Sequence, residues 1–455
     1  MRFFTISFLA SLASAAIIPP SSPESFDGHK VFRVKTGKSL SHVREKLSSI
    51  LPSWEAWNKN VHSHIDLAVA PQHLPAFEGL GLDCTVMHEN LGQSIKIEST
   101  PSSSLWKRQV DDLAWYDTYH PYDDHIQYWR DLQSSFPNQS EWISSGTSYE
   151  GRDLFGLHLW GDSGPGKPAV LWHGTVHARE WISNMVVEYL TLQLINGYKS
   201  ANPSVRTILD TYDVYVIPIV NPDGFVYAQT TNRLWRKNRQ PPRPEKNSTC
   251  IGTDINRNWE FAWAPGTGGS SPDPCSQTYA GSAPSDSPEN KGLDTLVRKL
   301  RDTTGLRLYI DWHSYGQYFL FPFGYNETAL LPGLPKWTKT ASLMSETIRD
   351  SKPDRLTTFT YGPGGAVLYK SVGNSRDHVY AIGGAEFSWT IELPDTGRYG
   401  FVLPPELIRP TVEEAWTGQE VLLTVFDDVF FDGVGTCKDP IVTKQIRLDQ
   451  DQTAS

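Results

Sequence analysis

The stretch AVLWHGTVHAREWISNM, residues 169–185, decides the fold of this chain. It opens with an apolar, strand-like run at 169–172, passes the turn residue Gly174 and enters a helical pattern at 181–197. Strands that are apolar throughout are typical of sheets buried on both faces. Functional side chains in such folds lie beyond the carboxyl ends of the strands. The segment 177–180 is therefore the first candidate for a site.

The same pattern recurs over residues 109–436. Apolar runs alternate with amphipathic segments, which predicts an α/β fold: a mixed, mostly buried β-sheet flanked by helices on both faces. The predicted strands are 169–172, 214–220, 306–310 and 388–393, and the predicted helices are 181–197, 285–302, 336–349 and 405–423.

Residues 17–108 are predicted to form a separate unit. Strand-like segments at 31–34, 65–69 and 84–87 alternate with helix-like segments at 41–50 and 71–79, a pattern typical of a small open α/β sandwich.

A polar linker at 99–104 follows this unit and is followed by the dibasic pair Lys107 and Arg108. Exposed linkers are preferred sites of proteolysis. The pair predicts a processing site that separates a prodomain from residues 109–436; an ordinary charged linker is the alternative. The tail, 437–455, is polar.

Composition narrows the class of protein. The 455 residues are 39% hydrophobic and 20% charged, which excludes a mostly disordered or fibrous chain. The length favours two or more domains. A formal net charge of −10 argues against a nucleic-acid or anionic-membrane binder.

The first 16 residues resemble a secretory signal peptide. Arg2 gives a positive start, Phe3 to Leu12 an apolar core and Ala13-Ser14-Ala15 a cleavage signal; a buried N-terminal element is the alternative. We expect export, to the exterior or to a vacuole-like compartment, and no membrane span. Predicted glycosylation sites are Asn138, Asn247 and Asn326.

Four cysteines allow three pairings in an oxidising compartment. Cys250 and Cys275 are the closest pair in sequence, whereas Cys84 and Cys437 lie near opposite ends and either pair or stay free.

His177 and Glu180 are three residues apart, so one helical turn would place them on one face. An imidazole and a carboxylate there can bind zinc, and a catalytic zinc site needs a third protein ligand. His313, after the predicted strand 306–310, is the best candidate. His173 is a rival, although its position on a strand need not share that face.

Two basic stretches, 233–239 and 254–259, combine arginines with aromatic residues. Arginines can stabilise an oxyanion or hold a carboxylate through paired hydrogen bonds; a solvated basic surface is the alternative. Glu392, at the end of the strand 388–393, is a candidate general base. The alternative is a salt-bridged structural glutamate, which many strand ends carry.

Taken together, these segments resemble the zinc carboxypeptidases of the carboxypeptidase A/B type over about residues 28–430. The stretches that carry the resemblance are His177–Ile182, Asn221–Gly224, Arg233–Arg239, Asp254–Trp259, Asp311–Tyr315 and Glu392–Phe401.

The resemblance implies a carboxypeptidase-like fold and one zinc ion held by His177, Glu180 and His313. Glu392 would be the catalytic base and acid, and Arg236 would polarise the scissile carbonyl. Asp254 would orient a zinc ligand, and a Cys250–Cys275 disulfide is implied as well. Further substrate-binding residues implied by the resemblance are Arg179, Asn256, Arg257, Ser314, Tyr315 and Tyr369.

The spacing of these motifs, compared with that of the family, also implies that Arg376 lies at the base of the pocket for the last substrate side chain. A buried arginine there would select acidic C-terminal residues. Arg376 could instead turn away and pair with Asp377. Gly364 and Gly365 replace bulkier pocket residues, and the chain between Tyr369 and Glu392 is one residue longer than in typical members.

The predicted function is that of a secreted, monomeric metallocarboxypeptidase zymogen that acts on peptide or protein C-termini and is inhibited by its own prodomain. The first alternative is a catalytically inactive binding protein of the same fold with a role in cell-wall organisation. The second, a nucleic-acid binder that uses 233–239, conflicts with the net charge.

Overall fold

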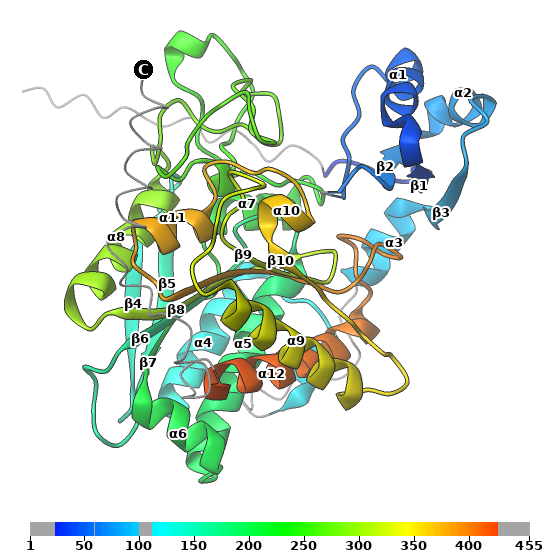
Figure 1. Ribbon diagram of the computed structural model, residues 1–455. Coiled ribbons are helices and arrows are strands. Elements are labelled where there is room, and N and C mark those ends of the chain that lie inside the picture. Colours follow the sequence, from blue (N-terminus) through cyan, green and yellow to red (C-terminus); the bar gives the residue numbers. More distant parts are fainter. Residues whose placement is uncertain (1–22, 59, 100–111, 426–455) are drawn as a thin grey trace, which may run out of the picture.

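The computed structural model describes residues 23–58, 60–99 and 112–425. These form a small unit, residues 23–99, beside a large unit, residues 112–425 (Figure 1). The predicted signal peptide, the dibasic pair Lys107-Arg108, Cys437 and the tail 437–455 lie outside the described residues.

The large unit is built on an eight-stranded mixed sheet. Its spatial order is β10-β9-β11-β8-β6-β7-β5-β4. Strands β11, β8, β6 and β7 are parallel to their neighbours in this run, while β9 runs antiparallel to β11 and β5 antiparallel to β7. The strands are β4 (Ser140–Thr147), β5 (Asp153–Leu159), β6 (Ala169–Gly174), β7 (Asp213–Ile217), β8 (Leu306–Ser314), β9 (Tyr318–Phe321), β10 (Thr360–Pro363) and β11 (Phe387–Leu393).

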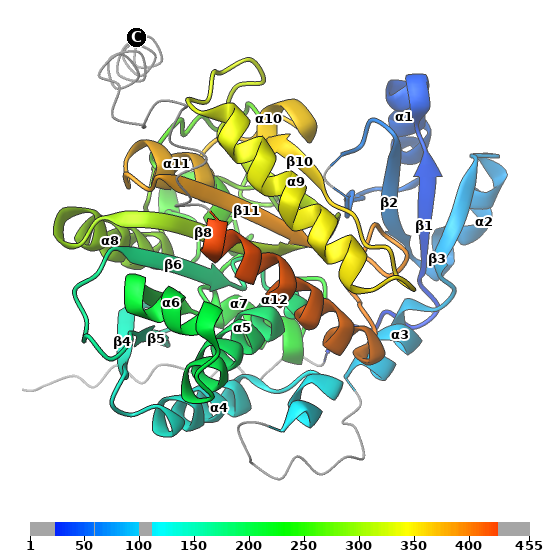
Figure 2. The ribbon, with the colours of Figure 1, turned by 60° about the horizontal axis from the view of Figure 1, so that its bottom comes forward.

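Helices cover both faces of this sheet. One hydrophobic cluster joins the sheet to α4, α5, α6, α9 and α12, and a second joins the opposite face to α8 and α11. Figure 2 shows α9 and α12 packed side by side across the first face. The helices are α4 (Tyr122–Ser135), α5 (Trp181–Lys199), α6 (Pro203–Thr211), α7 (Pro222–Thr230), α8 (Pro288–Thr303), α9 (Leu334–Ser351), α10 (Gly364–Val367), α11 (Ser375–Ala381) and α12 (Ile408–Val425).

Alternating side chains of the central strands supply the two clusters. Val170 and Trp172 of β6 belong to the first, whereas Ala169 and Leu171 belong to the second. Both sets are fully buried, which explains the unbroken apolar runs in the sequence. Within the described part of the chain, no helix has the length and apolar character needed to cross a membrane.

The four predicted strands and four predicted helices of the large unit are confirmed, with shifted ends. Strand β7 stops at Ile217 instead of 220, because Pro218 has no N–H to donate to the ladder. Helix α8 starts at Pro288 rather than 285, because the Ser287 side chain caps it by accepting from Asn290 N. The two outermost strands at each end of the sheet, β10 and β9 at one end and β5 and β4 at the other, were not predicted.

The small unit confirms the predicted open sandwich. Its sheet has the order β2-β1-β3, and both outer strands are antiparallel to β1. Its elements are β1 (Lys30–Lys35), β2 (His64–Val69), β3 (Cys84–His88), α1 (Leu40–Ile50), α2 (Leu74–Gly79) and α3 (Leu91–Glu98).

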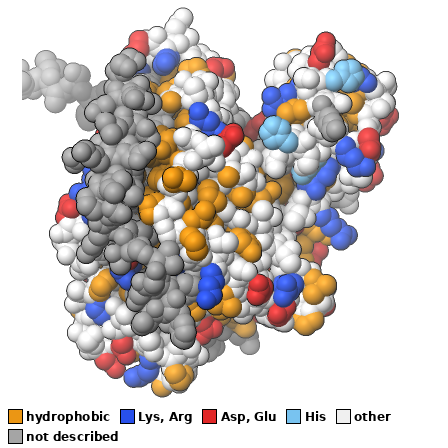
Figure 3. All heavy atoms as spheres, in the orientation of Figure 1, with side chains coloured by type: hydrophobic (Ala, Val, Ile, Leu, Met, Phe, Trp, Pro, Cys, Tyr) orange, Lys and Arg blue, Asp and Glu red, His pale blue; other side chains and the backbone are white. Residues whose placement is uncertain are grey.

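The two units share a buried interface. Phe26, Trp57 and Leu91 of the small unit form one hydrophobic cluster with Tyr315 and Phe401 of the large unit. Figure 3 shows the small unit meeting the large unit along one side. Positive and negative side chains are interspersed on the outer surface of the small unit.

A buried carboxylate fixes helix α5, whose first turn follows the candidate site. Glu188 accepts from Trp115 Nε1 at 2.9 Å and from Trp129 Nε1 at 3.1 Å, and its Oε1 lies 2.8 Å from His125 Nδ1. All of these side chains are buried, so the carboxylate joins the segment before α4, α4 itself and α5.

Replacing this carboxylate should destabilise the large unit strongly. We expect Glu188→Ala to lower the free energy of unfolding by about 3–5 kcal/mol, because it leaves buried donors without their acceptor. Urea denaturation of the purified protein measures the change. The exposed Glu346→Ala on α9 is the control and should stay within about 0.5 kcal/mol of the parent. A Glu188→Ala variant as stable as the control would contradict this role.

Candidate metal centre and substrate cleft

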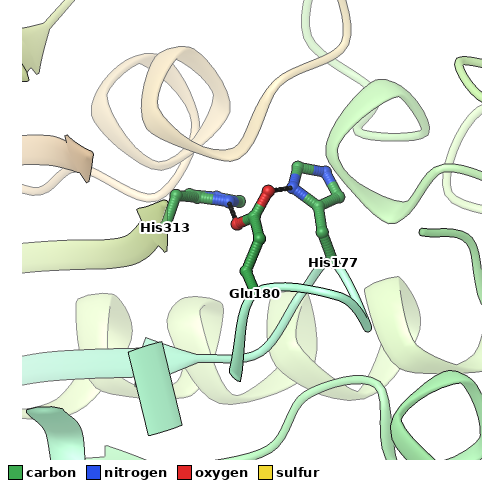
Figure 4. A group of neighbouring side chains, drawn as sticks. All are labelled: His177, Glu180 and His313. Carbon is green, nitrogen blue, oxygen red and sulfur yellow. Dashed lines mark hydrogen bonds and ion pairs between the residues drawn. The ribbon is translucent and has the colours of Figure 1, made fainter. Parts of the chain in front are cut away.

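Three side chains from two neighbouring strand ends converge at the edge of the large sheet (Figure 4). His177 lies in the turn after β6, Glu180 lies directly before α5, and His313 lies near the end of β8. His177 Nδ1 is 2.9 Å from Glu180 Oε1, and His313 Nδ1 is 2.8 Å from Glu180 Oε2. Strands β6 and β8 pair in parallel, so both deliver their residues to the same edge.

The local geometry differs from the expected helical turn. His177 and Glu180 belong to a tight turn, in which Glu180 N donates to the His177 carbonyl at 3.1 Å, and α5 begins only at Trp181. The turn brings the two side chains together as a helix would.

The chemistry of this trio fits zinc. One atom from each residue can be chosen so that all lie within 4.8 Å of one another, and all three residues are at most 1% exposed. Two imidazoles and one carboxylate are a ligand set of catalytic zinc sites. Among the described residues, this is the only grouping of three His, Cys, Asp or Glu side chains with such geometry. His173, the predicted rival, instead lies 2.6 Å from the Tyr309 hydroxyl through its Nε2.

Asp254 and Arg236 surround the ligand His177. Asp254 Oδ1 is 3.2 Å from His177 Nε2, and Asp254 Oδ2 is 2.8 Å from Arg236 Nη2. Burial alone would raise the pKa of Asp254, but Arg236 and His177 hold it well below its usual range. Burial and Arg236 lower the pKa of His177, which favours the neutral imidazole that a metal requires. Arg236 Nη1 also lies 4.0 Å from Glu180 Oε1, directly beside the trio.

Glu392 faces the same cleft from the next strand. In the parallel pairing of β11 with β8 it lies opposite His313. Glu392 is 2% exposed and lines a cavity together with His177, Arg236 and Arg257. The structure therefore brings the predicted catalytic glutamate to the predicted zinc ligands.

The predicted clamp residues line this cavity too. Arg257 Nη2 donates to the Tyr369 hydroxyl at 2.5 Å, and Arg257 Nε donates to the Gly269 carbonyl. Asn256 also lines the cavity, but its amide is engaged: Oδ1 accepts from Ser375 N at 2.8 Å.

Arg376 also lines this cavity and is 3% exposed. A Cβ atom at Gly364 or at Gly324 would collide with its Nη2, so the two glycines make room for the guanidinium. Arg376 Nε is 3.4 Å from Asp377 Oδ1 without a hydrogen bond. Asp377 accepts instead from Gly324 N and Tyr325 N at 2.8–2.9 Å. The guanidinium thus belongs to the cavity.

Three other predicted substrate-binding residues adjoin the small unit or the metal centre. Arg179 Nη2 lies 2.9 Å from Glu55 Oε1, and the Tyr315 hydroxyl donates to Asp66 at 2.8 Å. Ser314 N donates to Glu180 Oε2 at 3.2 Å.

The remaining sequence predictions have clear outcomes. The Cys250–Cys275 disulfide is confirmed, and Cys84 is a half-buried free thiol. All three predicted glycosylation asparagines are exposed, and their modification stays a prediction.

The basic stretch 233–239 is not a solvated surface, because Arg233, Arg236 and Lys237 are each at most 5% exposed.

Sequence reasoning missed two contributors. Asp311 lies 2.8 Å from His313 Nε2, and only its spacing of two residues along the same strand could have suggested this. Glu98, at the end of α3, binds Arg233 through Nε and Nη2 at 2.6 and 2.7 Å. Nothing local in the sequence marks that contact between the units.

Comparisons with known proteins agree with this geometry. A family model described as zinc carboxypeptidase matches residues 125–418. Metallocarboxypeptidase A of Trichophyton tonsurans is 39% identical over 419 residues, covering 91% of this chain and 96% of the relative. Carboxypeptidase B of Bos taurus is 33% identical over 426 residues, covering 91% of this chain and 96% of that relative.

A solved structure has the same fold over both units. The crystal structure of thrombin activatable fibrinolysis inhibitor superposes with a TM-score of 0.79 and 26% identity, covering 89% of this chain and 100% of that one. The chain therefore belongs to the zinc carboxypeptidase family, with His177, Glu180 and His313 as its zinc ligands.

Proposed function

We propose that this metallocarboxypeptidase is a secreted zymogen whose active form removes acidic residues from peptide C-termini. The observation that carries the specificity is Arg376, a buried residue of the cavity that Glu392 and Arg257 also line. A guanidinium there pairs with the side-chain carboxylate of a terminal Glu or Asp.

The catalytic steps follow from the side chains around the metal. Zinc, when bound, supplies Lewis-acid polarisation and lowers the pKa of water. Glu392 takes a proton from the attacking water and passes it to the leaving amine. Arg236, held by Asp254, stabilises the oxyanion that develops on the scissile carbonyl.

A second group of side chains holds the C-terminal end of the substrate. Arg257 binds the terminal carboxylate, and Tyr369, in contact with Arg257, covers it. These interactions orient the last peptide bond toward Glu392. Glu392 beside the zinc ligands favours this reading over that of an inactive binding protein.

Replacing Glu392 tests the catalytic role. We expect Glu392→Gln to lower kcat on a peptide with C-terminal Glu by roughly 10²–10⁴-fold, because the amide cannot accept the proton. Zinc content, measured by elemental analysis, should remain one per chain. The exposed Glu346→Gln is the matched control and should keep full activity. Undiminished turnover by Glu392→Gln would refute the assignment.

Replacing Arg376 tests the specificity. The processed enzyme should release C-terminal Glu or Asp in preference to Leu or Lys. Arg376→Gln should lower kcat/KM for the Glu peptide by roughly 10–100-fold, the value of a charge-assisted hydrogen bond, and leave the Leu peptide nearly unchanged. A parent enzyme that prefers Leu would overturn the specificity while leaving the reaction class intact.

The small unit is suited to the role of an inhibitory prodomain. Glu55 binds Arg179, and Glu98, fully buried, binds Arg233. Arg179 directly precedes the zinc ligand Glu180, so these acidic side chains approach the metal centre from the face on which the small unit lies. A propeptide of residues 17–108 would then be released by cleavage after Arg108.

Proteolysis tests the zymogen state. The full chain should be nearly inactive, and limited cleavage after Lys107 or Arg108 should raise its activity at least tenfold. Glu98→Gln should raise the activity of the uncleaved chain, because the buried contact with Arg233 loses its charge. Glu78→Gln, exposed on α2, is the control. Full activity before cleavage would rule out the inhibitory role.

A further inference from the structure

A fully buried carboxylate, that of Asp311, adjoins the zinc ligand His313. Asp311 Oδ1 lies 2.8 Å from His313 Nε2, while the other ring nitrogen, Nδ1, lies 2.8 Å from Glu180 Oε2. Asp311 and His313 are two residues apart on β8, so both side chains point to the same face of the sheet. The imidazole is therefore held between two carboxylates.

Contacts of the second carboxylate oxygen, Oδ2, fix the orientation of Asp311. Oδ2 accepts from Ser375 Oγ at 2.5 Å and from Asn256 Nδ2 at 3.4 Å. Asp311 and Ser375 are at most 1% exposed. Behind them, His173 Nδ1 lies 3.5 Å from Asp311 Oδ1. The carboxylate has no freedom to turn away from His313 without losing these contacts.

We propose that Asp311 is a positioning residue for the metal: its contact with Nε2 of His313 holds the imidazole ring so that Nδ1 is aimed at zinc. A hydrogen bond to the second ring nitrogen fixes the tautomer and the ring orientation of a metal-bound histidine. Asp254 occupies the corresponding position beside His177, with Oδ1 at 3.2 Å from Nε2. Each histidine ligand thus has its own buried carboxylate.

Zinc affinity tests this role without reference to activity. The variants are Asp311→Asn, which keeps the shape, and Asp311→Ser, which removes the carboxylate but keeps a small polar group. Competition with a chromophoric chelator should show a zinc Kd raised about 10–100-fold in both. The visible spectrum of the Co²⁺-loaded variants should also differ from that of the Co²⁺-loaded parent, because the His313 ring is no longer held in place.

Asp213 supplies a matched control. It is fully buried on the same sheet, but it begins β7 at the opposite end of the strands and binds Lys167 Nζ at 3.0 Å. Asp213→Asn should lose stability without changing the zinc Kd or the Co²⁺ spectrum. The proposal fails if either folded Asp311 variant, verified by circular dichroism, binds zinc as tightly as the parent. It also fails if Asp213→Asn weakens zinc to the same extent.

Discussion

The parallel register of β6, β8 and β11 is the constraint on which the active site depends. In this register His173 lies opposite Asp311, and His313 lies opposite Glu392. Parallel strands end at one edge of the sheet, so residues far apart in the sequence meet there. A slip of one residue would turn His313 to the other face and separate it from Glu180. The helices on both faces hold the register, because each strand buries alternate side chains in two different clusters.

The cost of burying so many charges is offset by close pairing around the metal. Arg236 stands between the carboxylates of Asp254 and Glu180, and each imidazole lies between two carboxylates. Buried charges are tolerated when partners and hydrogen bonds compensate the lost hydration. The same arrangement holds the side chains in one orientation before substrate arrives, which is the condition for electrostatic catalysis.

The cleft and the contact with the small unit are built from the same basic stretch. Arg236 faces the metal, whereas Arg233, three residues earlier, binds Glu98 of the small unit and stacks over Trp181 at 3.8 Å. Trp181 is the first residue of α5 and directly follows the zinc ligand Glu180. The contact between the units therefore lies one residue from a zinc ligand along the chain. The interface and the metal centre thus share one short segment of the chain at the start of α5.

The sequence by itself determined the central strands and the main helices, because apolar periodicity is a local property of the chain. Its short motifs offered His177, Glu180 and His313 as candidate ligands, and the zinc set and the Cys250–Cys275 disulfide followed from the resemblance that those motifs carry. The sequence did not determine the outer strands β4, β5, β9 and β10, whose pairing supplies no comparable local signal. Only the tertiary structure decided the partners of Glu98, Asp311 and Arg376. These contacts join residues through space, and whether a buried charge faces a ligand, a cavity or another unit depends on the strand register and packing that bring them together.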